Sequence, residues 1–248
     1  MKVLSIGNSF SQDGQRWLHQ CAASVGVDLT CVNLCIGGCS LARHWQNVQS
    51  GEPAYEYEVN GCFERKAALV ATLQEEDWDV VTIQQVSGDA GRPQSYLPEL
   101  PWLAEVIRRE CPKATLYLQQ TWGYEYGSDH PAMKPYNCDD HEMFRRVRDG
   151  YDMAAKLVDA KLIPSGEVVY RVRQLPRFDV KNGGESLHRD GYHLSLVYGR
   201  YVVAVTWLAT LCGVDPEAVT FVPSDDGVTA DPAVLAELQA VVKAVVSA

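Results

Sequence analysis

Residues 2–11 read Lys2-Val3-Leu4-Ser5-Ile6-Gly7-Asn8-Ser9-Phe10-Ser11. The short apolar run from Lys2 to Ile6 ends at a glycine, which is typical of a buried strand. Apolar residues at helical spacing follow from Gln12 to Val25 and stop near Gly26. A strand followed by a helix is the start of a βαβ unit, so this stretch predicts a parallel sheet.

The rest of the chain repeats the alternation of strand and helix. Further strands are predicted at residues 29–36, 80–84, 115–119 and 162–163, and helices at 41–48, 67–74, 97–110, 140–160, 166–174, 195–212 and 231–246. Asp231 is the expected N-cap of the last helix, with Pro232 at its first position. This order predicts a three-layer α/β/α sandwich with a parallel sheet of about five strands.

Residues 52–66 depart from this alternation. Tyr55 to Val59 alternate between aromatic or apolar and acidic residues, and Asn60-Gly61 is a strong hairpin signal. We therefore expect a small β-hairpin insertion here. The length of 248 residues suits one domain, covering residues 1–248.

The composition favours a globular protein that acts on a small or neutral ligand. Hydrophobic residues make up 46% of the chain and charged residues 22%, and the formal net charge is -10. A nucleic acid would be repelled by this average charge. Arg145, Arg146 and Arg148 are the densest basic group, and their spacing is typical of a solvated helix face. We expect a small-molecule or glycan partner and no nucleic acid.

The N-terminal apolar run is too short for the core of a signal peptide. The longest uncharged stretch, residues 201–214, is also short of the roughly twenty residues that a membrane span needs. We therefore expect a cytoplasmic protein with no membrane partner. The sequence predicts no oligomeric state.

Eight cysteines are present, and Cys31, Cys35 and Cys39 follow one another at a spacing of four. On a strand, this spacing puts Cys31 and Cys35 roughly 13 Å apart, which is too far for one tetrahedral zinc ion. We expect these side chains to be small buried hydrophobes, and we expect neither a metal nor a cofactor.

We expect the residues of an active site where the predicted strands end, because open α/β sheets bind ligands outside the carboxyl ends of their strands. Ser9 follows the first strand, Gly37-Gly38 the second and Gln84-Gln85 the third. Asp190-Gly191-Tyr192-His193 stands in a loop before a late helix.

These residues have the parts of a serine esterase. A serine hydroxyl needs a base to remove its proton, and histidine is the usual base. Asp190 lies three residues before His193 and can fold back onto its second ring nitrogen, which fixes the tautomer. The N–H groups of Ser9 and Gly38 and an amide from the third strand end can stabilise an oxyanion. Ser11 is a rival nucleophile, further from the strand end.

This arrangement resembles the SGNH-hydrolase superfamily, also called GDSL esterases. Gly7-Asn8-Ser9-Phe10-Ser11 stands where that family has Gly-Asp-Ser-Leu, Gly37 or Gly38 matches its second block, and Asp190-Gly191-Tyr192-His193 matches its Asp-x-x-His. The order agrees from Ser9 to His193. The resemblance implies a flavodoxin-like sheet, a catalytic triad of Ser9, His193 and Asp190, and an acyl-enzyme mechanism.

One block departs from the family pattern. The family has Gly-x-Asn-Asp at the third strand end, where this chain has Gln84-Gln85. A glutamine amide can donate the same hydrogen bond, and some branches of the family, including glycan O-acetylesterases, look similar in using Gln there. We expect Gln85 to be the third oxyanion donor, with Gln84 as the alternative.

Residues 123–137 form a long loop rich in Gly, Pro, Tyr and Asp, of the kind that often carries function. Trp122, Tyr124 and His188 are candidates for contact with substrate, since aromatic faces stack on sugar rings. Asp13 lies near a strand end without an assigned partner.

The predicted function is hydrolysis of short acyl esters, acetyl above all, on a carbohydrate. Two alternatives stay open. One is a lipase- or thioesterase-like hydrolase on the same triad, which requires an apolar acyl groove. The other is a non-catalytic carbohydrate-binding relative, which the altered third block favours.

Overall fold

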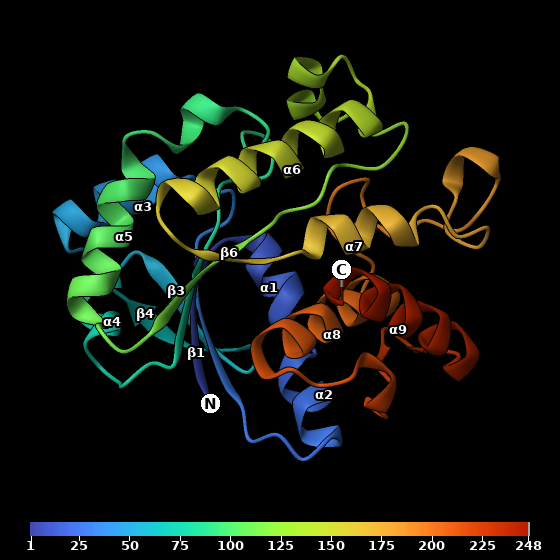
Figure 1. Ribbon diagram of the computed structural model, residues 1–248, viewed down its shortest axis with the longest axis horizontal. Coiled ribbons are helices and arrows are strands. Elements are labelled where there is room, and N and C mark those ends of the chain that lie inside the picture. Colours follow the sequence, from blue (N-terminus) through green and yellow to red (C-terminus); the bar gives the residue numbers. More distant parts are fainter. Residues whose placement is uncertain (248) are drawn as a thin grey trace.

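The computed structural model describes residues 1–247 and is built on one central sheet (Figure 1). The seven strands of this sheet have the order β4-β3-β2-β1-β5-β6-β7. They are β1 (Lys2–Gly7), β2 (Thr30–Cys35), β3 (Tyr55–Val59), β4 (Cys62–Ala67), β5 (Val80–Ile83), β6 (Thr115–Gln119) and β7 (Lys161–Ile163). Two short strands, β8 (Ser224–Asp225) and β9 (Val228–Thr229), pair with each other apart from it.

The parallel part of the sheet has the expected flavodoxin-like order. β1 pairs with β2 on one side and with β5 on the other, and β6 and β7 follow beyond β5. After β4 the chain returns past β2 and β1 to form β5, so its direction across the sheet reverses between β1 and β5. Such a switch point is where open α/β sheets bind their ligands.

The sheet has more strands than the five or so predicted, because the hairpin joins it. β3 pairs antiparallel with β2, and β4 pairs antiparallel with β3. Asn60 and Gly61 form the turn with φ values of 49° and 82°, as a two-residue hairpin of type I′ requires. The hairpin is thus one edge of the main sheet. The first five residues of β4, which include Glu64, Arg65 and Lys66, are exposed.

Helices cover both faces of the sheet. They are α1 (Ser9–Gln15), α2 (Leu18–Ser24), α3 (Leu41–Ser50), α4 (Leu69–Leu73), α5 (Glu99–Glu110), α6 (Asp140–Leu157), α7 (Ser165–Val172), α8 (Tyr198–Cys212) and α9 (Pro232–Val246). α3, α4 and α5 pack together on one face, while α1, α2, α7, α8 and α9 form the layer on the other (Figure 1). The prediction of a three-layer α/β/α fold is confirmed.

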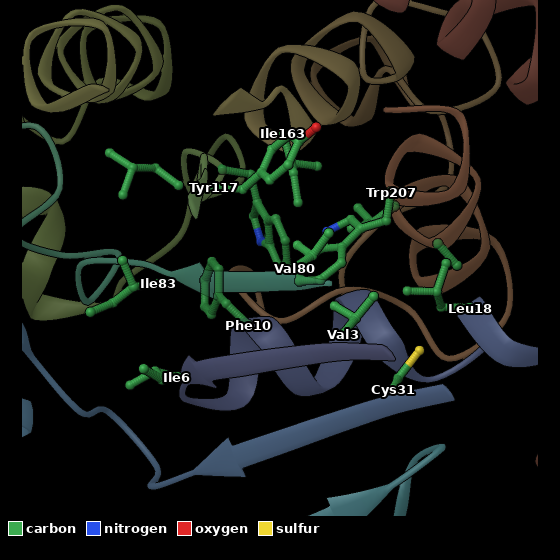
Figure 2. Close-up of a cluster of buried hydrophobic side chains, with 14 of the residues drawn as sticks. Val3, Ile6, Phe10, Leu18, Cys31, Val80, Ile83, Tyr117, Ile163 and Trp207 are labelled. Atoms are coloured by element: carbon green, nitrogen blue, oxygen red, sulfur yellow. The ribbon is translucent and has the colours of Figure 1, made fainter. Parts of the chain in front are cut away.

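The core lies between the sheet and these two helical layers. β1 is buried on both sides, as a central parallel strand requires. Figure 2 shows Val3 of β1 beside Leu18 of α2 and Trp207 of α8, all three of which are fully buried. Removing a large side chain from such packing typically costs about 2–5 kcal/mol of stability. The sheet is therefore a rigid base for the loops at its carboxyl edge.

The single helix predicted over residues 12–25 is wrong, because α1 and α2 are separated at Trp17. The indole of Trp17 donates a hydrogen bond to the carbonyl of Leu196, 3.0 Å away, which holds this break against a distant loop. α1 also begins earlier than predicted, at Ser9, because the side chain of Asn8 caps it. This shift places the candidate nucleophile in the first turn of a helix.

The late helices differ little from the prediction. The helix predicted over residues 195–212 begins at Tyr198 and is buried along most of its length. Asp231 is the N-cap of α9, and its Oδ1 accepts a hydrogen bond of 2.9 Å from the N–H of Ala233. Among the residues that the structure describes, no helix is both long and apolar enough to cross a membrane.

Candidate active site

Ser9 is the first residue of α1, separated from the end of β1 by Asn8 alone. The side chain of Asn8 fixes this turn from three directions. Its Oδ1 accepts hydrogen bonds from the Phe10 N–H at 3.0 Å and from the Gln84 amide at 2.8 Å, and its Nδ2 donates to the Cys39 carbonyl at 3.0 Å. Asn8 thus ties the nucleophile turn to the ends of β2 and β5, the two neighbours of β1.

The side chains of Ser9, His193 and Asp190 form one hydrogen-bonded chain. The Nε2 atom of His193 lies 2.9 Å from Ser9 Oγ, and its Nδ1 lies 2.6 Å from Asp190 Oδ2. A carboxylate only accepts hydrogen bonds, so Nδ1 carries a proton and a neutral ring has Nε2 free to accept the Ser9 hydroxyl proton. The structure therefore brings together the three residues that the sequence pattern selects, 184 positions apart between Ser9 and His193.

The electrostatics of Asp190 suit the orienting role. Partial burial disfavours its charged form, but hydrogen bonds from the His193 ring and from the N–H groups of His193 and Tyr192 outweigh that effect. The pKa of Asp190 is therefore held below its usual value. A carboxylate that stays ionised can hold the imidazole tautomer and stabilise an imidazolium.

The N–H groups of Ser9 and Gly38 are available to an oxyanion. Ser9 is the first residue of α1, so its N–H has no partner within the helix. Gly38 has a φ of +63°, a conformation that glycine adopts readily, in the turn after β2. Within residues 1–247, neither N–H donates a hydrogen bond. Both residues line the same cavity.

The structure does not bring Gln85 or Gln84 to the cavity as the expected third donor. The Gln85 amide donates to the Ser95 carbonyl at 2.6 Å, and its oxygen accepts from the N–H groups of Leu41 and Val86. Gln84 donates to Asn8 instead. Both side chains are buried. The Gln85 side chain binds backbone groups around the site, because loop N–H and C=O groups at the strand ends need partners, and the Gln84 side chain binds the Asn8 side chain.

Ser9 and His193 open into a cavity of about 340 Å³. Its walls are mostly apolar and aromatic, and the other lining residues are Asn8, Phe10, Gly37, Gly38, Val86, Ser87, Tyr124, His130 and Tyr192. The rings of Tyr124, His130 and Tyr192 form one wall, with centroids 4.6 to 5.3 Å apart. The hydroxyls of Tyr124 and Ser87 lie 3.0 Å apart, and burial raises the pKa of Tyr124 to about 12.

Of the three residues expected to contact substrate, only Tyr124 lines the cavity. Trp122 is fully buried behind it, stacked on Phe10 at a centroid distance of 4.2 Å, and its indole donates to the Tyr192 carbonyl. His188 is also buried, and its Nδ1 lies 3.2 Å from Glu125 Oε1. Burial lowers the pKa of His188. Trp122 thus supports the cavity wall through Phe10 and Tyr192, whereas His188 is not among the lining residues.

The sequence reasoning missed His130, Tyr192 and the role of Asn8. His130 belongs to the long loop after β6 that composition had marked as functional, but nothing in the sequence singles out one residue of that loop. Its Nδ1 accepts a hydrogen bond of 3.1 Å from the N–H of Ala132. The proton of the neutral ring is therefore on Nε2, which makes His130 a hydrogen-bond donor in the cavity wall.

The cysteines of β2 lie inside the protein. Cys31 and Cys35 are both buried, and burial raises the pKa of Cys35 to about 12. Among the described residues, no group of three or more His, Cys, Asp or Glu side chains is arranged to hold a metal ion.

A family of domains of unknown function, DUF4886, matches residues 2–241 of the sequence. The chain belongs to this family. A DUF4886 family protein from Bacteroides uniformis is 34% identical to it, with a TM-score of 0.91 over 100% of this chain and 95% of that chain. No curated protein matches the sequence.

The DUF4886 chain has the fold of the SGNH hydrolases. A protein from Slackia heliotrinireducens that is proposed to be an SGNH hydrolase is 20% identical, with a TM-score of 0.61 over 85% of this chain and 98% of that one. An acetylxylan esterase from Geobacillus stearothermophilus is 14% identical, with a TM-score of 0.53 over 89% of this chain and 94% of that one. At these identities, the likeness concerns the fold.

Proposed function

We propose that this DUF4886 protein is a serine esterase that removes short acyl groups, acetyl above all, from a carbohydrate. The observation that carries the proposal is the hydrogen-bonded chain from Ser9 Oγ to His193 at 2.9 Å and on to Asp190 at 2.6 Å, opening into a cavity. That geometry lies within the reach a nucleophile and its base require.

The proposed reaction runs in two halves. Ser9 Oγ attacks the ester carbonyl while His193 Nε2 takes the hydroxyl proton, and the N–H groups of Ser9 and Gly38 stabilise the resulting oxyanion. When the tetrahedral intermediate collapses, His193 returns the proton to the leaving alcohol and an acyl-enzyme remains. Water then attacks this ester with His193 again as base, which releases the acid and frees Ser9.

Reactivity at Ser9 tests the proposal directly. A fluorophosphonate probe should label the wild-type protein at Ser9, since only an activated serine reacts with it. Mass spectrometry of the labelled peptide identifies the site. A folded wild-type protein that takes up no label would favour the non-catalytic carbohydrate-binding relative instead.

The size of the cavity favours a short acyl group. About 340 Å³ is at the lower end of the range for small-molecule sites, roughly 300–1,000 Å³. An acetyl group and part of a sugar ring fill such a space, and aromatic walls are suited to sugar faces. The similar fold of an acetylxylan esterase agrees with this substrate class.

We expect p-nitrophenyl acetate to be hydrolysed with a higher kcat/KM than esters of longer chain. The series from two to twelve carbons measures this, and the value should fall beyond about four carbons, because the acyl chain and the p-nitrophenyl group have to share this one cavity. A kcat/KM that instead rises with chain length would favour the lipase- or thioesterase-like alternative.

We expect His130→Ala to raise KM for an acetylated sugar by about tenfold, because one hydrogen bond contributes on the order of 1 kcal/mol and the ring adds stacking. Initial rates against substrate concentration measure the effect. His141→Ala is the matched control, since His141 contacts Tyr170 and is not among the cavity residues. An equal KM in both variants would mean that His130 does not contact the sugar.

A further inference from the structure

Asp13 is a buried acid on the same helix as the candidate nucleophile. It lies four residues after Ser9 in α1, so the two side chains project from the same face of the helix. The Asp13 residue is 0% exposed. A carboxylate without access to water needs close and well-placed partners, and those partners show what the residue does.

Both carboxylate oxygens of Asp13 are bound by groups that flank the candidate base. Arg189 Nη1 lies 3.0 Å from Oδ1 and 3.1 Å from Oδ2, and the N–H of Leu194 donates to Oδ2 at 3.0 Å. Arg189 comes directly before Asp190, and Leu194 directly after His193. The segment 190–193 is thus fastened to Asp13 at both of its ends.

Further contacts make the attachment of Arg189 and Leu194 to Asp13 rigid. Arg200 of α8 donates from Nε to Asp13 Oδ1 at 2.7 Å, so two guanidinium groups share the one carboxylate. Arg189 also donates from Nη1 to the Leu194 carbonyl, and its N–H donates to the His193 carbonyl at 2.9 Å. The loop is therefore closed on itself and tied to α1. Nothing else in the proposed reaction uses these groups.

We propose that Asp13 is a positioning residue that sets the His193 ring against Ser9. The inference rests on the proposed function, because it assigns Asp13 a part in that reaction. α1 carries Ser9 at its start and Asp13 one turn later, so the same rigid helix supports both the nucleophile and the anchor of the base. Their separation is then fixed by one element rather than by two independent loops.

The size of the effect follows from how strongly the rate depends on position. A displacement of about 1 Å between reacting groups can cost on the order of 10²-fold in rate. Asp13→Asn keeps the shape of the side chain but removes the charge and one acceptor, which loosens the hold on Arg189 and the Leu194 N–H. The loss should fall on kcat, because Asp13 does not line the cavity where substrate binds.

The experiment compares Asp13→Asn with Gln239→Ala, a variant that is destabilised elsewhere. Gln239 is buried and donates to Tyr201 and to the Val219 carbonyl; it lies outside the cavity lining and is not a partner of Asp13. Both variants should have a lowered Tm. Assayed well below that Tm on p-nitrophenyl acetate, Asp13→Asn should lose about 10²-fold in kcat with KM within about threefold, and Gln239→Ala should keep wild-type values of both.

A second readout does not depend on turnover. The proton on His193 Nδ1, hydrogen-bonded to Asp190, should give a downfield imidazole resonance, and its loss in His193→Ala would assign it. It should shift or broaden in Asp13→Asn and stay in place in Gln239→Ala. If Asp13→Asn does not fold, Arg189→Met serves instead, because Arg200 still neutralises Asp13; it should lose about tenfold in kcat.

The outcomes separate the two proposals. A wild-type kcat in Asp13→Asn, or a loss that Gln239→Ala shares, overturns the positioning role of Asp13. If the wild-type protein neither hydrolyses esters nor reacts with fluorophosphonate, the proposed function fails, and Asp13 has no reaction to serve. An unchanged His193 resonance in Asp13→Asn overturns the positioning role whatever the activity is.

Discussion

Ser9→Ala should reduce kcat for p-nitrophenyl acetate by about 10⁶-fold, the loss seen when a serine nucleophile is removed from such a triad. The variant lacks the one atom that forms the acyl-enzyme, while the N–H groups of Ser9 and Gly38 stay in place. The change removes a hydroxyl and leaves the helix cap at Asn8 intact, so the Tm should stay close to that of the wild type. Steady-state kinetics and a thermal melt measure the two quantities.

Ser11→Ala is the matched control, because Ser11 is the rival nucleophile. Its hydroxyl is buried and hydrogen-bonded to the Asn8 carbonyl and to Asn33 Oδ1, both at 2.7 Å. The Ser11→Ala variant should be less stable by about 1–3 kcal/mol, because buried polar groups lose their partner. It should still form the acyl-enzyme in a rapid first turnover, as the wild type does. If turnover survives in Ser9→Ala and disappears in Ser11→Ala, the nucleophile is Ser11 and not Ser9.

Asp190→Asn should lower kcat by about 10⁴-fold with little change in KM, because an amide at this position no longer favours the tautomer that accepts the Ser9 proton. His193 Nδ1 would then face either an N–H or a weaker acceptor. Fluorophosphonate labelling of Ser9 should slow in the same proportion. A loss of less than about tenfold would show that His193 keeps its tautomer without Asp190.

The pH dependence follows from the sign of the Asp190 shift. Its pKa is lowered in the folded protein, so the carboxylate stays charged as pH falls through the ordinary value of about 3.9. The stabilisation from this group is present above its unfolded pKa and is lost only as pH falls through the lower, folded value. The acid limb of kcat/KM should therefore show no additional loss from protonation of Asp190 down to about pH 4.

The sequence pattern predicts best those site residues that lie next to the end of a strand or the start of a helix. Ser9, Gly38 and the Asp190 to His193 segment follow strands or precede a helix, and periodicity places such boundaries to within a few residues. Parallel strand ends then meet at one edge of the sheet, whatever the side chains are. This is why an early serine and a late histidine can be paired without coordinates.

The parts that were missed depend on partners that are distant in sequence. Gln85 does not face the cavity because its amide group is already bonded: it donates to the Ser95 carbonyl and accepts from the Leu41 N–H. Trp122 is turned inward by stacking on Phe10. Asp13 had no visible role because its partners lie 176 to 187 positions away. Periodicity and composition carry no information on such contacts.

The hairpin has a consequence for solubility. An outer strand offers a row of unpaired backbone groups on which another polypeptide can assemble, and charged side chains oppose such growth. β4 is that outer strand, and Glu64, Arg65 and Lys66 lie exposed along it. The opposite margin, β7, has only three residues. Both borders of the sheet are thus poor templates for amyloid-like stacking.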